Sequence, residues 1–255
     1  MNVATIQTSL FWEDVDKNLK MFSEKINQIE SDVDLIILPE MFTTGFTNNT
    51  AIIQKEDNQK AIDFLKNIVK GKACAVCGSF IFKEGEKFYN RLFWIDETQT
   101  KHYDKKHLFS YAKEQYYFEA GKEKLIVDYK GWKILPLICY DLRFPVWSKR
   151  TKNENYDLLI YVANWPERRN FAWQQLLIAR AIENQSYTIG LNRVGHDGNE
   201  IYYSGDSAII DFMGENITKN AHEEIILTAN LDKEKQDNFR KSFTALEDDD
   251  LFTIH

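Results

Sequence analysis

The chain has 255 residues, 44% of them apolar and 14% aromatic, which is enough for one sizeable core and too much for a disordered chain. Its 32 basic and 39 acidic residues give a net charge of −7 without a block of Lys or Arg, so the composition disfavours nucleic acid as a partner. Apolar runs such as Leu158–Ala163 are far shorter than the roughly 20 residues of a membrane-spanning helix, and the acidic start lacks a signal-peptide core. We therefore expect a cytoplasmic protein with no membrane partner.

The first half of the chain predicts alternating strands and helices. Apolar residues between 12 and 29 recur at steps of three and four, which indicates one face of a helix. The short apolar run at 34–38 is typical of a strand buried on both faces, and the polar residues at 83–86 predict a hairpin turn. We expect strands at 2–8, 34–38, 73–82, 87–96 and 99–103, and helices at 12–29 and 58–70.

The second half repeats this alternation. Pro145 favours the start of a helix, and Asn170 is a possible N-cap of another. Residues 236–255 show no clear pattern, although the acidic run at 247–250 indicates a solvated turn or face. We expect strands at 124–129, 132–138, 157–163, 187–193, 206–211 and 224–230, and helices at 145–152 and 170–184.

No repeat, low-complexity stretch or Pro/Gly-rich linker interrupts residues 1–255, so a single domain is the simplest interpretation. Strands and helices alternate, but several strands pair by hairpins. This pattern predicts an α/β layered fold with mixed sheets covered by helices. The strands are numerous enough for two sheets.

The three cysteines are an odd number, and with no secretion signal they argue against a disulfide framework. Cys74 and Cys77 form a C-x-x-C, but this pair falls in a predicted strand, where residues three apart point to opposite faces. The five histidines also lack the spacing of zinc ligands. We therefore expect no metal site.

Polar and reactive residues follow three of the predicted buried strands, close to three of the four prolines. Glu40, Cys139 and Asn164 come at the ends of LIILPEMF, ILPLICYDLRFP and LIYVANWPE. Ligands of open α/β sheets collect at the carboxyl ends of strands, so these residues are candidates for one convergent site. Taken singly, a cysteine such as Cys139 is more often a small buried side chain.

A fourth segment, HYDKKHLF, places Lys105, Lys106 and His107 on a loop after a strand. A cysteine thiol ionises near pH ~8.5, so it needs a base to act as a nucleophile, and Glu40 is suited to take its proton. A nearby ammonium favours the thiolate and can bind a developing oxyanion. Carboxylate, amine and thiol together fit acyl transfer through a thioester.

With these segments in place, the sequence resembles the nitrilase (carbon–nitrogen hydrolase) superfamily along nearly its whole length. The segments that carry the resemblance are LPEMFTTGF (38–46), YDKKHLF (103–109), ICYDLRFP (138–145), ANWP (163–166) and ARAIENQSY (179–187). Further details resemble the omega-amidase branch, whose members hydrolyse the terminal amide of 2-oxoglutaramate and 2-oxosuccinamate: EMFTTGFT, NRVGHDG (192–198) and SGDSAIID (204–211). The resemblance implies a four-layer α-β-β-α sandwich with two mixed sheets, a homodimer, a small amide substrate and no cofactor.

The resemblance also implies catalytic roles. Glu40 matches the general base of the family, and Cys139 matches the nucleophile. Lys105 matches the catalytic lysine, which lies two residues before the histidine of the H-L-F segment, here His107. The backbone N–H of Tyr140 would join Lys105 in binding the oxyanion.

Family members have a second active-site glutamate, seven residues before a glycine that follows the lysine motif. With Gly121 as that glycine, the match is Glu114. Glu119 is the competing candidate. The sequence leaves this choice open.

A 2-oxo diacid monoamide carries a carboxylate, which an arginine can bind through a pair of hydrogen bonds. Arg168 and Arg169, just after ANWP, are the nearest arginines in sequence to a strand end. We expect Arg143 to pair with Asp141 or another acid, and Arg180 with Glu183. The residues expected to bind substrate are Phe42, Thr43, Tyr140, Asn164, Trp165 and Arg168, with Thr44 and Phe46 as further candidates for the acyl pocket.

Other functions stay open at this point. The same core residues would serve another superfamily amidase, a carbamoylase, a nitrilase or an acyltransferase. A papain-like hydrolase would instead pair Cys139 with His107, although the sequence motif typical of such a nucleophile is missing. A non-catalytic binding protein on the same fold is a third possibility, and a metal-dependent phosphoesterase would need clustered Asp and His ligands.

Overall fold

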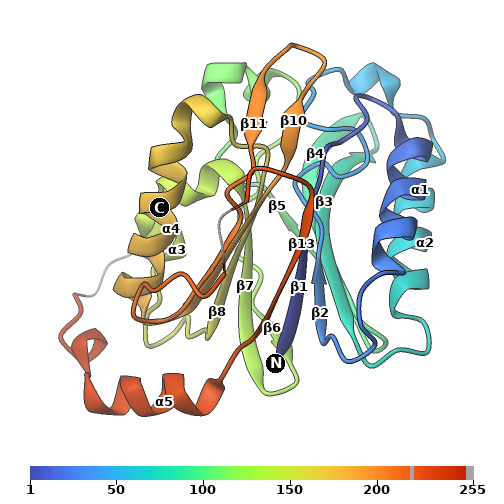
Figure 1. Ribbon diagram of the computed structural model, residues 1–255. Helices are drawn as coiled ribbons and strands as arrows, with labels where there is room; N and C mark the ends of the chain where they lie inside the picture. Colours follow the sequence, from blue (N-terminus) through green and yellow to red (C-terminus); the bar gives the residue numbers. More distant parts are fainter. Residues whose placement is uncertain (219–220, 251–255) are drawn as a thin grey trace.

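Two mixed β-sheets stack face to face, and each carries helices on its outer side, in the computed structural model of this protein (Figure 1). The structure describes residues 1–218 and 221–250. Helices α1 (Val15–Ile26) and α2 (Asp57–Val69) form one outer layer, and α3 (Pro145–Ser148) with α4 (Asn170–Asn184) forms the other. The predicted α-β-β-α sandwich is confirmed.

The first sheet has six strands in the order β13-β1-β2-β3-β4-β5. Strands β1, β2 and β3 run parallel, whereas β13, β4 and β5 add antiparallel neighbours. The parallel strands are buried on both faces, as their continuous apolar sequences predict. Their bounds are β1 (Asn2–Gln7), β2 (Leu35–Ile37), β3 (Ala75–Glu84), β4 (Lys87–Ile95), β5 (Thr100–Asp104) and β13 (Ile225–Asn230).

The second sheet has five strands in the order β12-β9-β8-β7-β6. Its central strands β7, β8 and β9 are parallel, and its two edge strands are antiparallel to their neighbours. A separate hairpin of β10 (Val194–His196) and β11 (Tyr202–Ser204) stands beyond this sheet. The five strands are β6 (Val127–Tyr129), β7 (Trp132–Ile138), β8 (Leu158–Ala163), β9 (Tyr187–Asn192) and β12 (Ala208–Ile210).

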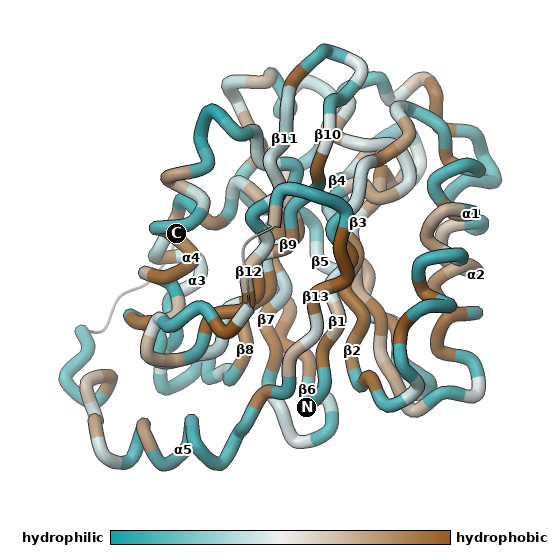
Figure 2. The backbone as a smooth tube through the Cα atoms, viewed as in Figure 1, coloured by the Kyte–Doolittle hydropathy of each residue, from teal (hydrophilic) through white to brown (hydrophobic). Residues whose placement is uncertain are grey.

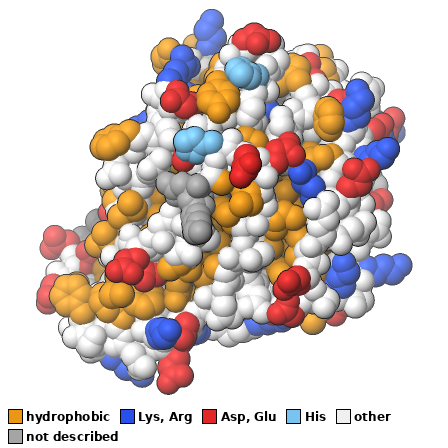
Figure 3. Space-filling view, viewed as in Figure 1, with side chains coloured by type: hydrophobic (Ala, Val, Ile, Leu, Met, Phe, Trp, Pro, Cys, Tyr) orange, Lys and Arg blue, Asp and Glu red, His pale blue; other side chains and the backbone are white. Residues whose placement is uncertain are grey.

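One large apolar core fills the space between the two sheets and extends to α4. Leu92 and Trp94 of the first sheet share it with Leu137 and Ile160 of the second. A second core lies between the first sheet and helices α1 and α2. Figure 2 shows the matching pattern, with hydrophobic strands inside and hydrophilic helix surfaces outside, and Figure 3 shows acidic and basic side chains interspersed over the same face of the molecule. Because both sheets build the central core, we infer that the chain forms a single domain.

Most predicted elements form within a few residues of their expected bounds, but several differ. Helix α3 ends at Ser148, well short of residue 152. Asn170 is not an N-cap, because a 3₁₀ turn at Glu167–Arg169 precedes α4 and the Asn170 side chain donates to Asp206 instead. The β10–β11 hairpin and helix α5 (Lys233–Ser242) were not predicted.

Cys74 and Cys77 face opposite sides of the first sheet, as predicted for residues three apart in a strand. Cys77 faces the core between the sheets, whereas Cys74 belongs to the core under the helices, and all three cysteines of the chain are free. Along 1–218 and 221–250, no helix is both long and apolar enough to cross a bilayer.

Helix α5 is held to the second sheet by charged hydrogen bonds around Asp157, the residue before β8. The Asp157 carboxylate accepts from Arg240 Nη1 and Lys233 Nζ of α5, each at 2.8 Å, and from the backbone N of Lys133 at 3.0 Å. Burial alone would raise the pKa of Asp157, but the hydrogen bonds from Lys233 and Lys133 outweigh it and lower the pKa. The ionised form therefore stabilises the fold.

Replacing Asp157 with Asn should lower the free energy of unfolding by about 2–3 kcal/mol at pH 7, since hydrogen bonds between charged groups are lost. A carboxyl whose folded-state pKa is lowered stabilises the protein above its unfolded pKa of about 3.9, and this contribution disappears as the pH falls below that value. The difference in the free energy of unfolding between the wild type and Asp157→Asn should therefore decrease below about pH 4. Denaturant unfolding between pH 7 and pH 3 measures it.

Asp128→Asn is the matched control. Asp128 is largely exposed, and within the described residues its side chain pairs only with Lys133, at 3.0 Å, so its loss should change stability by less than about 1 kcal/mol. A gap for Asp157→Asn that stays constant down to pH 3 would contradict the assigned role of the carboxylate.

Candidate active site

The carboxyl ends of four strands meet at one end of the sandwich and bring the predicted residues together. Glu40 follows β2 after a short turn, Lys105 follows β5 directly, Cys139 follows β7 and Asn164 follows β8. Two of these strands belong to each sheet, so the site lies where the sheets face each other. This arrangement agrees with the expectation that ligands collect beyond strand ends.

Lys105 lies between two carboxylates in the protein interior. Its Nζ is 2.9 Å from Glu40 Oε1, 2.9 Å from Glu114 Oε2 and 3.1 Å from Glu114 Oε1. All three side chains are fully buried. An ion triad without solvent is stable only when its geometry and hydrogen bonds offset the cost of removing the charges from water.

The remaining hydrogen bonds to Glu40 come from two asparagines. The backbone N of Asn164 donates to Glu40 Oε2 at 2.8 Å, and Asn164 Nδ2 donates to the Glu40 carbonyl oxygen at 2.6 Å. Asn90 Nδ2 donates to Glu40 Oε1 at 2.9 Å. The carboxylate is therefore held in one orientation by donors from three separate strands or strand ends.

Cys139 occupies a sharp turn that begins where β7 ends. Its φ is +43°, a left-handed conformation that is costly for any residue except glycine. Asp141 stabilises the turn, because its Oδ2 accepts from the backbone N of Ile138 at 3.1 Å and from the Tyr103 hydroxyl at 2.8 Å. The Cys139 Sγ lies 3.9 Å from the Asn164 carbonyl oxygen.

Left-handed backbone recurs beside both glutamates. Met41 has a φ of +45° directly after Glu40, and Lys113 has a φ of +62° directly before Glu114. Such strain costs on the order of 1–3 kcal/mol per residue and is retained where the surrounding structure requires it. Both glutamates and the cysteine thus sit on or beside strained turns.

Burial and charge set the protonation of these groups. Burial lowers the pKa of Lys105, but the Glu114 and Glu40 carboxylates outweigh it and raise the pKa, so Lys105 is an ammonium. Burial also raises the pKa of Glu114 and, together with the charge of Glu40, raises the pKa of Cys139 well above its ordinary value. The resting cysteine is therefore a neutral thiol, and it must lose its proton as it attacks.

The second glutamate of the site is Glu114, not Glu119. Glu114 Oε2 contacts Lys105 and also accepts from the backbone N of Phe109 at 2.5 Å. Glu119 is about half exposed and pairs with Lys87 at 3.4 Å. Gly121, on which the sequence match depends, packs so tightly that a Cβ would lie 2.0 Å from the Asp104 carbonyl oxygen.

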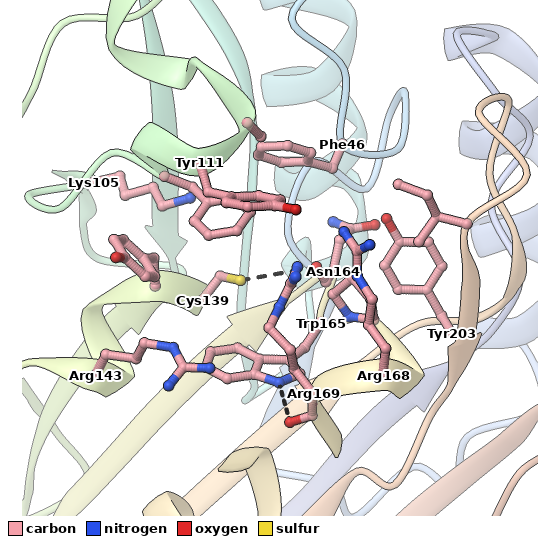
Figure 4. Close-up of a pocket in the computed structure, with 15 residues that line it drawn as sticks. Phe46, Lys105, Tyr111, Cys139, Arg143, Asn164, Trp165, Arg168, Arg169 and Tyr203 are labelled. Atoms are coloured by element: carbon pink, nitrogen blue, oxygen red, sulfur yellow. Dashed lines mark hydrogen bonds between the residues drawn. The ribbon is translucent and has the colours of Figure 1, made fainter. Parts of the chain in front are cut away.

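A cavity of about 230 Å³ opens above Cys139 (Figure 4). It is smaller than the 300–1,000 Å³ typical of pockets for drug-sized ligands, so it suits a small substrate. The Cys139 sulfur and the guanidinium groups of Arg168 and Arg169 are turned toward the same space. Its walls are largely aromatic: Phe46, Phe109, Tyr111, Tyr140, Trp165 and Tyr203.

Four of the six residues expected to bind substrate line this cavity: Tyr140, Asn164, Trp165 and Arg168. Phe42 and Thr43 do not, which corrects the expectation based on their proximity to Glu40 in sequence. The turn at Met41 directs the chain back onto β3, where the Phe42 backbone N donates to the Ser79 carbonyl oxygen at 2.9 Å. The Phe42 ring is then buried against Phe22 and Phe80 in the core under the helices.

Thr43 and Thr44 are also buried away from the cavity. Asn18 Nδ2 of α1 donates to the Thr43 carbonyl oxygen at 2.8 Å, so this segment anchors the first helix. Phe46, the remaining candidate for the acyl pocket, does line the cavity, and Lys105 Nζ lies 5.4 Å from its ring centroid.

Three arginines line the cavity without a carboxylate partner among residues 1–218 and 221–250: Arg143, Arg168 and Arg169. Their guanidinium groups instead lie over aromatic rings, Arg143 over Trp165 at 4.8 Å and Arg169 over Phe109 at 5.1 Å. Burial and the charges of its neighbours lower the pKa of Arg169. The mouth of the cavity therefore carries positive charge that a bound anion would neutralise.

The expected pairing of Arg143 with Asp141 is wrong, because the Asp141 side chain is already engaged. Its Oδ1 accepts from the backbone N of His107 at 3.0 Å and lies 2.8 Å from His107 Nδ1. The His107 ring also stacks on Phe144, with centroids 3.8 Å apart, and does not line the cavity. This position gives no support to a papain-like pairing of His107 with Cys139. The expected pair of Arg180 and Glu183 forms at 3.1 Å.

Sequence reasoning missed Asn90 and Tyr203. Asn90 interrupts an apolar strand with a polar residue on the side that faces the second sheet, and this break in alternation was the available signal. Tyr203 belongs to the unpredicted β10–β11 hairpin, and its hydroxyl donates to Asp197 Oδ2 at 2.9 Å. Among the residues that the structure describes, no group of three His, Cys, Asp or Glu side chains is arranged to hold a metal ion.

Comparisons with known proteins agree with this geometry. The sequence profile of the carbon–nitrogen hydrolase family matches residues 2–241, and the chain belongs to that family. Over 260 aligned residues the chain is 41% identical to the omega-amidase YafV of Escherichia coli K12, covering 100% of this chain and 98% of YafV. It is 32% identical to the 2-oxoglutaramate amidase of Bacillus subtilis 168, with 96% of each chain covered.

Among solved structures, the chain is similar to XC1258 of Xanthomonas campestris, a carbon–nitrogen hydrolase superfamily protein with an arsenic adduct in its active site. The two share 34% identity and a TM-score of 0.93, over 100% of this chain and 99% of XC1258. The protein is thus a hydrolase that acts on amide carbon–nitrogen bonds.

The two adjacent lysines provide a matched test of the buried triad. Lys105→Met leaves two buried carboxylates without a cation, so it should lower the free energy of unfolding by about 3–5 kcal/mol at pH 7. Carboxyl groups with raised pKa values destabilise the fold less as the pH falls and they bind protons, so the loss should diminish toward pH 4. Denaturant unfolding at both pH values measures the change.

Lys106→Met is the control, because Lys106 is half-buried and its Nζ lies over the face of Trp147, 5.3 Å from the ring centroid, with no carboxylate partner in 1–218 or 221–250. Its loss should cost about 1 kcal/mol or less. Equal destabilisation by the two substitutions would show that the triad is not the stabilising feature.

Proposed function

We propose that this carbon–nitrogen hydrolase is an omega-amidase, which hydrolyses the terminal amide of 2-oxoglutaramate or 2-oxosuccinamate to the 2-oxo diacid and ammonia. The observation that carries the proposal is the buried contact of Lys105 with Glu40, next to Cys139 and to a cavity lined by three arginines that have no carboxylate partner in the described part of the chain. The names of the E. coli and B. subtilis relatives support the same substrate class.

The first half of the proposed reaction forms a thioester. Glu40 accepts the Cys139 proton while Sγ bonds to the amide carbonyl carbon, and the carbonyl π electrons move to oxygen. The Lys105 ammonium and the backbone N–H of Tyr140 stabilise this oxyanion, and losing one such donor typically costs about 10²–10³ in rate. The C–N bond then breaks, and Glu40 returns its proton to the leaving nitrogen, which departs as ammonia.

The second half hydrolyses the thioester. Glu40 takes a proton from water as the water oxygen attacks the acyl carbon, and Glu114 and Lys105 hold the carboxylate in place. The C–S bond breaks, the 2-oxo diacid leaves and the Cys139 thiol regains its proton from Glu40. No cofactor is needed for these steps, because Glu40 serves first as base and then as acid in each half of the reaction.

The arginines support the choice of an oxo acid over an amino acid amide. The substrate carboxylate can bind Arg168 by a charge-assisted pair of hydrogen bonds. Arg143 and Arg169 add two further positive charges at the same mouth. Glutamine has the same carboxylate but carries an ammonium where the 2-oxo acid has a neutral carbonyl, so repulsion between this ammonium and the arginines disfavours glutamine.

We also propose that the enzyme is a cytoplasmic homodimer. The free state of all three cysteines fits a reducing compartment. Three large apolar side chains are exposed on the outer helical layer, Val146 of α3 and Phe171 and Ile182 of α4, which supports self-association there. Light scattering should give twice the mass of one chain, and Phe171→Glu should reduce it to one. A wild type with the mass of one chain would reject the dimer.

Ammonia release from a panel of substrates tests the function directly. The purified protein should release ammonia from 2-oxoglutaramate far faster than from glutamine, a nitrile or an N-carbamoyl amino acid. Cys139→Ala should abolish the activity and retain the fold. Turnover of the nitrile or carbamoyl compound without turnover of 2-oxoglutaramate would reject the substrate assignment.

Arg168→Gln refines the same assay. It should raise the KM for 2-oxoglutaramate by about 10- to 100-fold, since a charge-assisted hydrogen bond contributes about 1.5–3 kcal/mol. Butyramide, which has no carboxylate, is the matched control substrate, and its turnover should be unchanged. An equal loss with both substrates would mean that Arg168 shapes the cavity without binding the carboxylate.

A further inference from the structure

Asn90 stands at the point where the first sheet meets the buried triad. It lies on β4, paired with Ile81 of β3 on one side, and its carbonyl oxygen accepts from the backbone N of Lys105 at 3.0 Å on the other. The residue is fully buried. Its side chain shares the strand face of Leu92 and Trp94, which pack in the core between the sheets.

The Asn90 amide donates to both glutamates of the site. Its Nδ2 lies 2.9 Å from Glu40 Oε1 and 3.4 Å from Glu114 Oε1. Glu40 Oε1 is also the oxygen that contacts Lys105 Nζ. One neutral and one charged donor therefore converge on the same carboxylate oxygen.

Nothing else in the described part of the chain engages this amide. The Asn90 Oδ1 is buried without a hydrogen-bond partner along residues 1–218 and 221–250. A buried amide that leaves one polar atom unpaired lowers stability, so an apolar side chain would suit the core better. The hydrogen bonds from Asn90 to Glu40 and Glu114 offset this loss of stability and explain why a polar side chain occupies the position.

The charges around Glu40 explain why a neutral donor is useful here. Glu114 from the 3₁₀ turn at Glu114–Tyr116, Lys105 from the end of β5 and Cys139 from the end of β7 face the Glu40 carboxylate. Burial and Asp197 chiefly raise the pKa of Tyr203 on β11, and Glu40 adds a smaller part. Glu40 and Glu114 share the single ammonium of Lys105, so a further hydrogen-bond donor reduces the repulsion between the two carboxylates. The Asn90 amide is such a donor, and because it is neutral it does not exchange a proton with Glu40.

We propose that Asn90 is a positioning residue that fixes the orientation of Glu40 for proton transfer from Cys139, a role that rests on the thioester mechanism proposed above. Without the amide, Glu40 Oε1 keeps only Lys105 as a donor among the described residues. Asn164 still donates to Oε2, so one of the three segments that fix the carboxylate is lost and its orientation is less restricted. A displacement of about 1 Å in a reacting group can cost about 10²-fold in rate.

Alkylation of Cys139 by iodoacetamide tests the proposal without relying on the identity of the substrate. The rate is followed from pH 5 to pH 9 by mass spectrometry of the Cys139 peptide, in the wild type and in Asn90→Leu, Asn90→Ser and Asn90→Asp. The Leu and Ser variants should react about 10²-fold more slowly at pH 7. Loss of a hydrogen bond to a charged carboxylate favours its protonation, so the midpoint of the pH profile should move upward.

The Asp variant distinguishes orientation from simple packing. Asn90→Asp keeps the shape but adds a third carboxylate, so its midpoint should move furthest upward of the three. Thr5→Val is the matched control, because Thr5 is buried on β1 of the same sheet and its Oγ1 also lacks a partner. Its rate and midpoint should equal those of the wild type.

Folded variants with wild-type rates and midpoints would overturn the proposal, as would variants that lose thermal stability but keep the wild-type pH profile. If Asn90→Leu does not fold, the polar variants Asn90→Ser and Asn90→Asp decide the question. Hydrolysis of 2-oxoglutaramate is measured in parallel. A wild type that does not hydrolyse it, yet shows the dependence of alkylation on Asn90, would reject the omega-amidase assignment and leave the role of Asn90 standing.

Discussion

The ammonium of Lys105, buried between Glu40 and Glu114, is the interaction on which the rest of the site depends. Neither carboxylate would remain charged in this interior without it, because an unpaired buried charge is strongly unfavourable. The lysine comes from the end of β5, and its two partners come from the turn after β2 and from a 3₁₀ turn beyond β5. Pairing these charges therefore fixes three chain segments relative to one another.

The need to bring these side chains together also explains where the backbone is strained. Met41, Lys113 and Cys139 each adopt a left-handed conformation on or beside a residue of the site. A relaxed turn at any of these points would move a carboxylate or the thiol out of reach. Hydrogen bonds from Asn164 to Glu40, and from Ile138 and Tyr103 to Asp141, hold the strained segments in place. The stability of the sandwich thus supports an arrangement that local preferences oppose.

Sequence reasoning found the parts of the site that follow strands. Glu40, Cys139 and Asn164 each come just after a predicted strand, and the rule that strand ends converge predicts that they lie together. The loop after the next predicted strand offered Lys105, Lys106 and His107, and the resemblance to the nitrilase superfamily selected Lys105. Asn90 was missed because it lies within a strand, where its partners are set by the stacking of two sheets. Phe42 was misplaced because nothing in the sequence shows that Met41 turns the chain back into the core.

The secondary-structure elements also differ in how well the sequence predicts them, depending on whether local sequence or tertiary contacts determine them. Long periodic segments such as α1, β3 and β4 were predicted because their own apolar pattern determines them. Helix α5 was not, since it has few apolar residues and is held by contacts of Arg240 and Lys233 with Asp157. The β10–β11 hairpin, which supplies Tyr203 to the cavity, pairs its strands locally, but its first residue also depends on a distant segment, because the Val194 backbone N donates to the Thr8 carbonyl oxygen at 3.2 Å.

The most direct test of this account is to trap the covalent intermediate. The enzyme is mixed with 2-oxoglutaramate, quenched in acid within the first turnover and digested, and its peptides are weighed by mass spectrometry. The account predicts an acyl group on the peptide that contains Cys139, formed as ammonia is released, and its absence in Glu40→Gln. Ammonia release without any adduct, or an adduct on another residue, would contradict it.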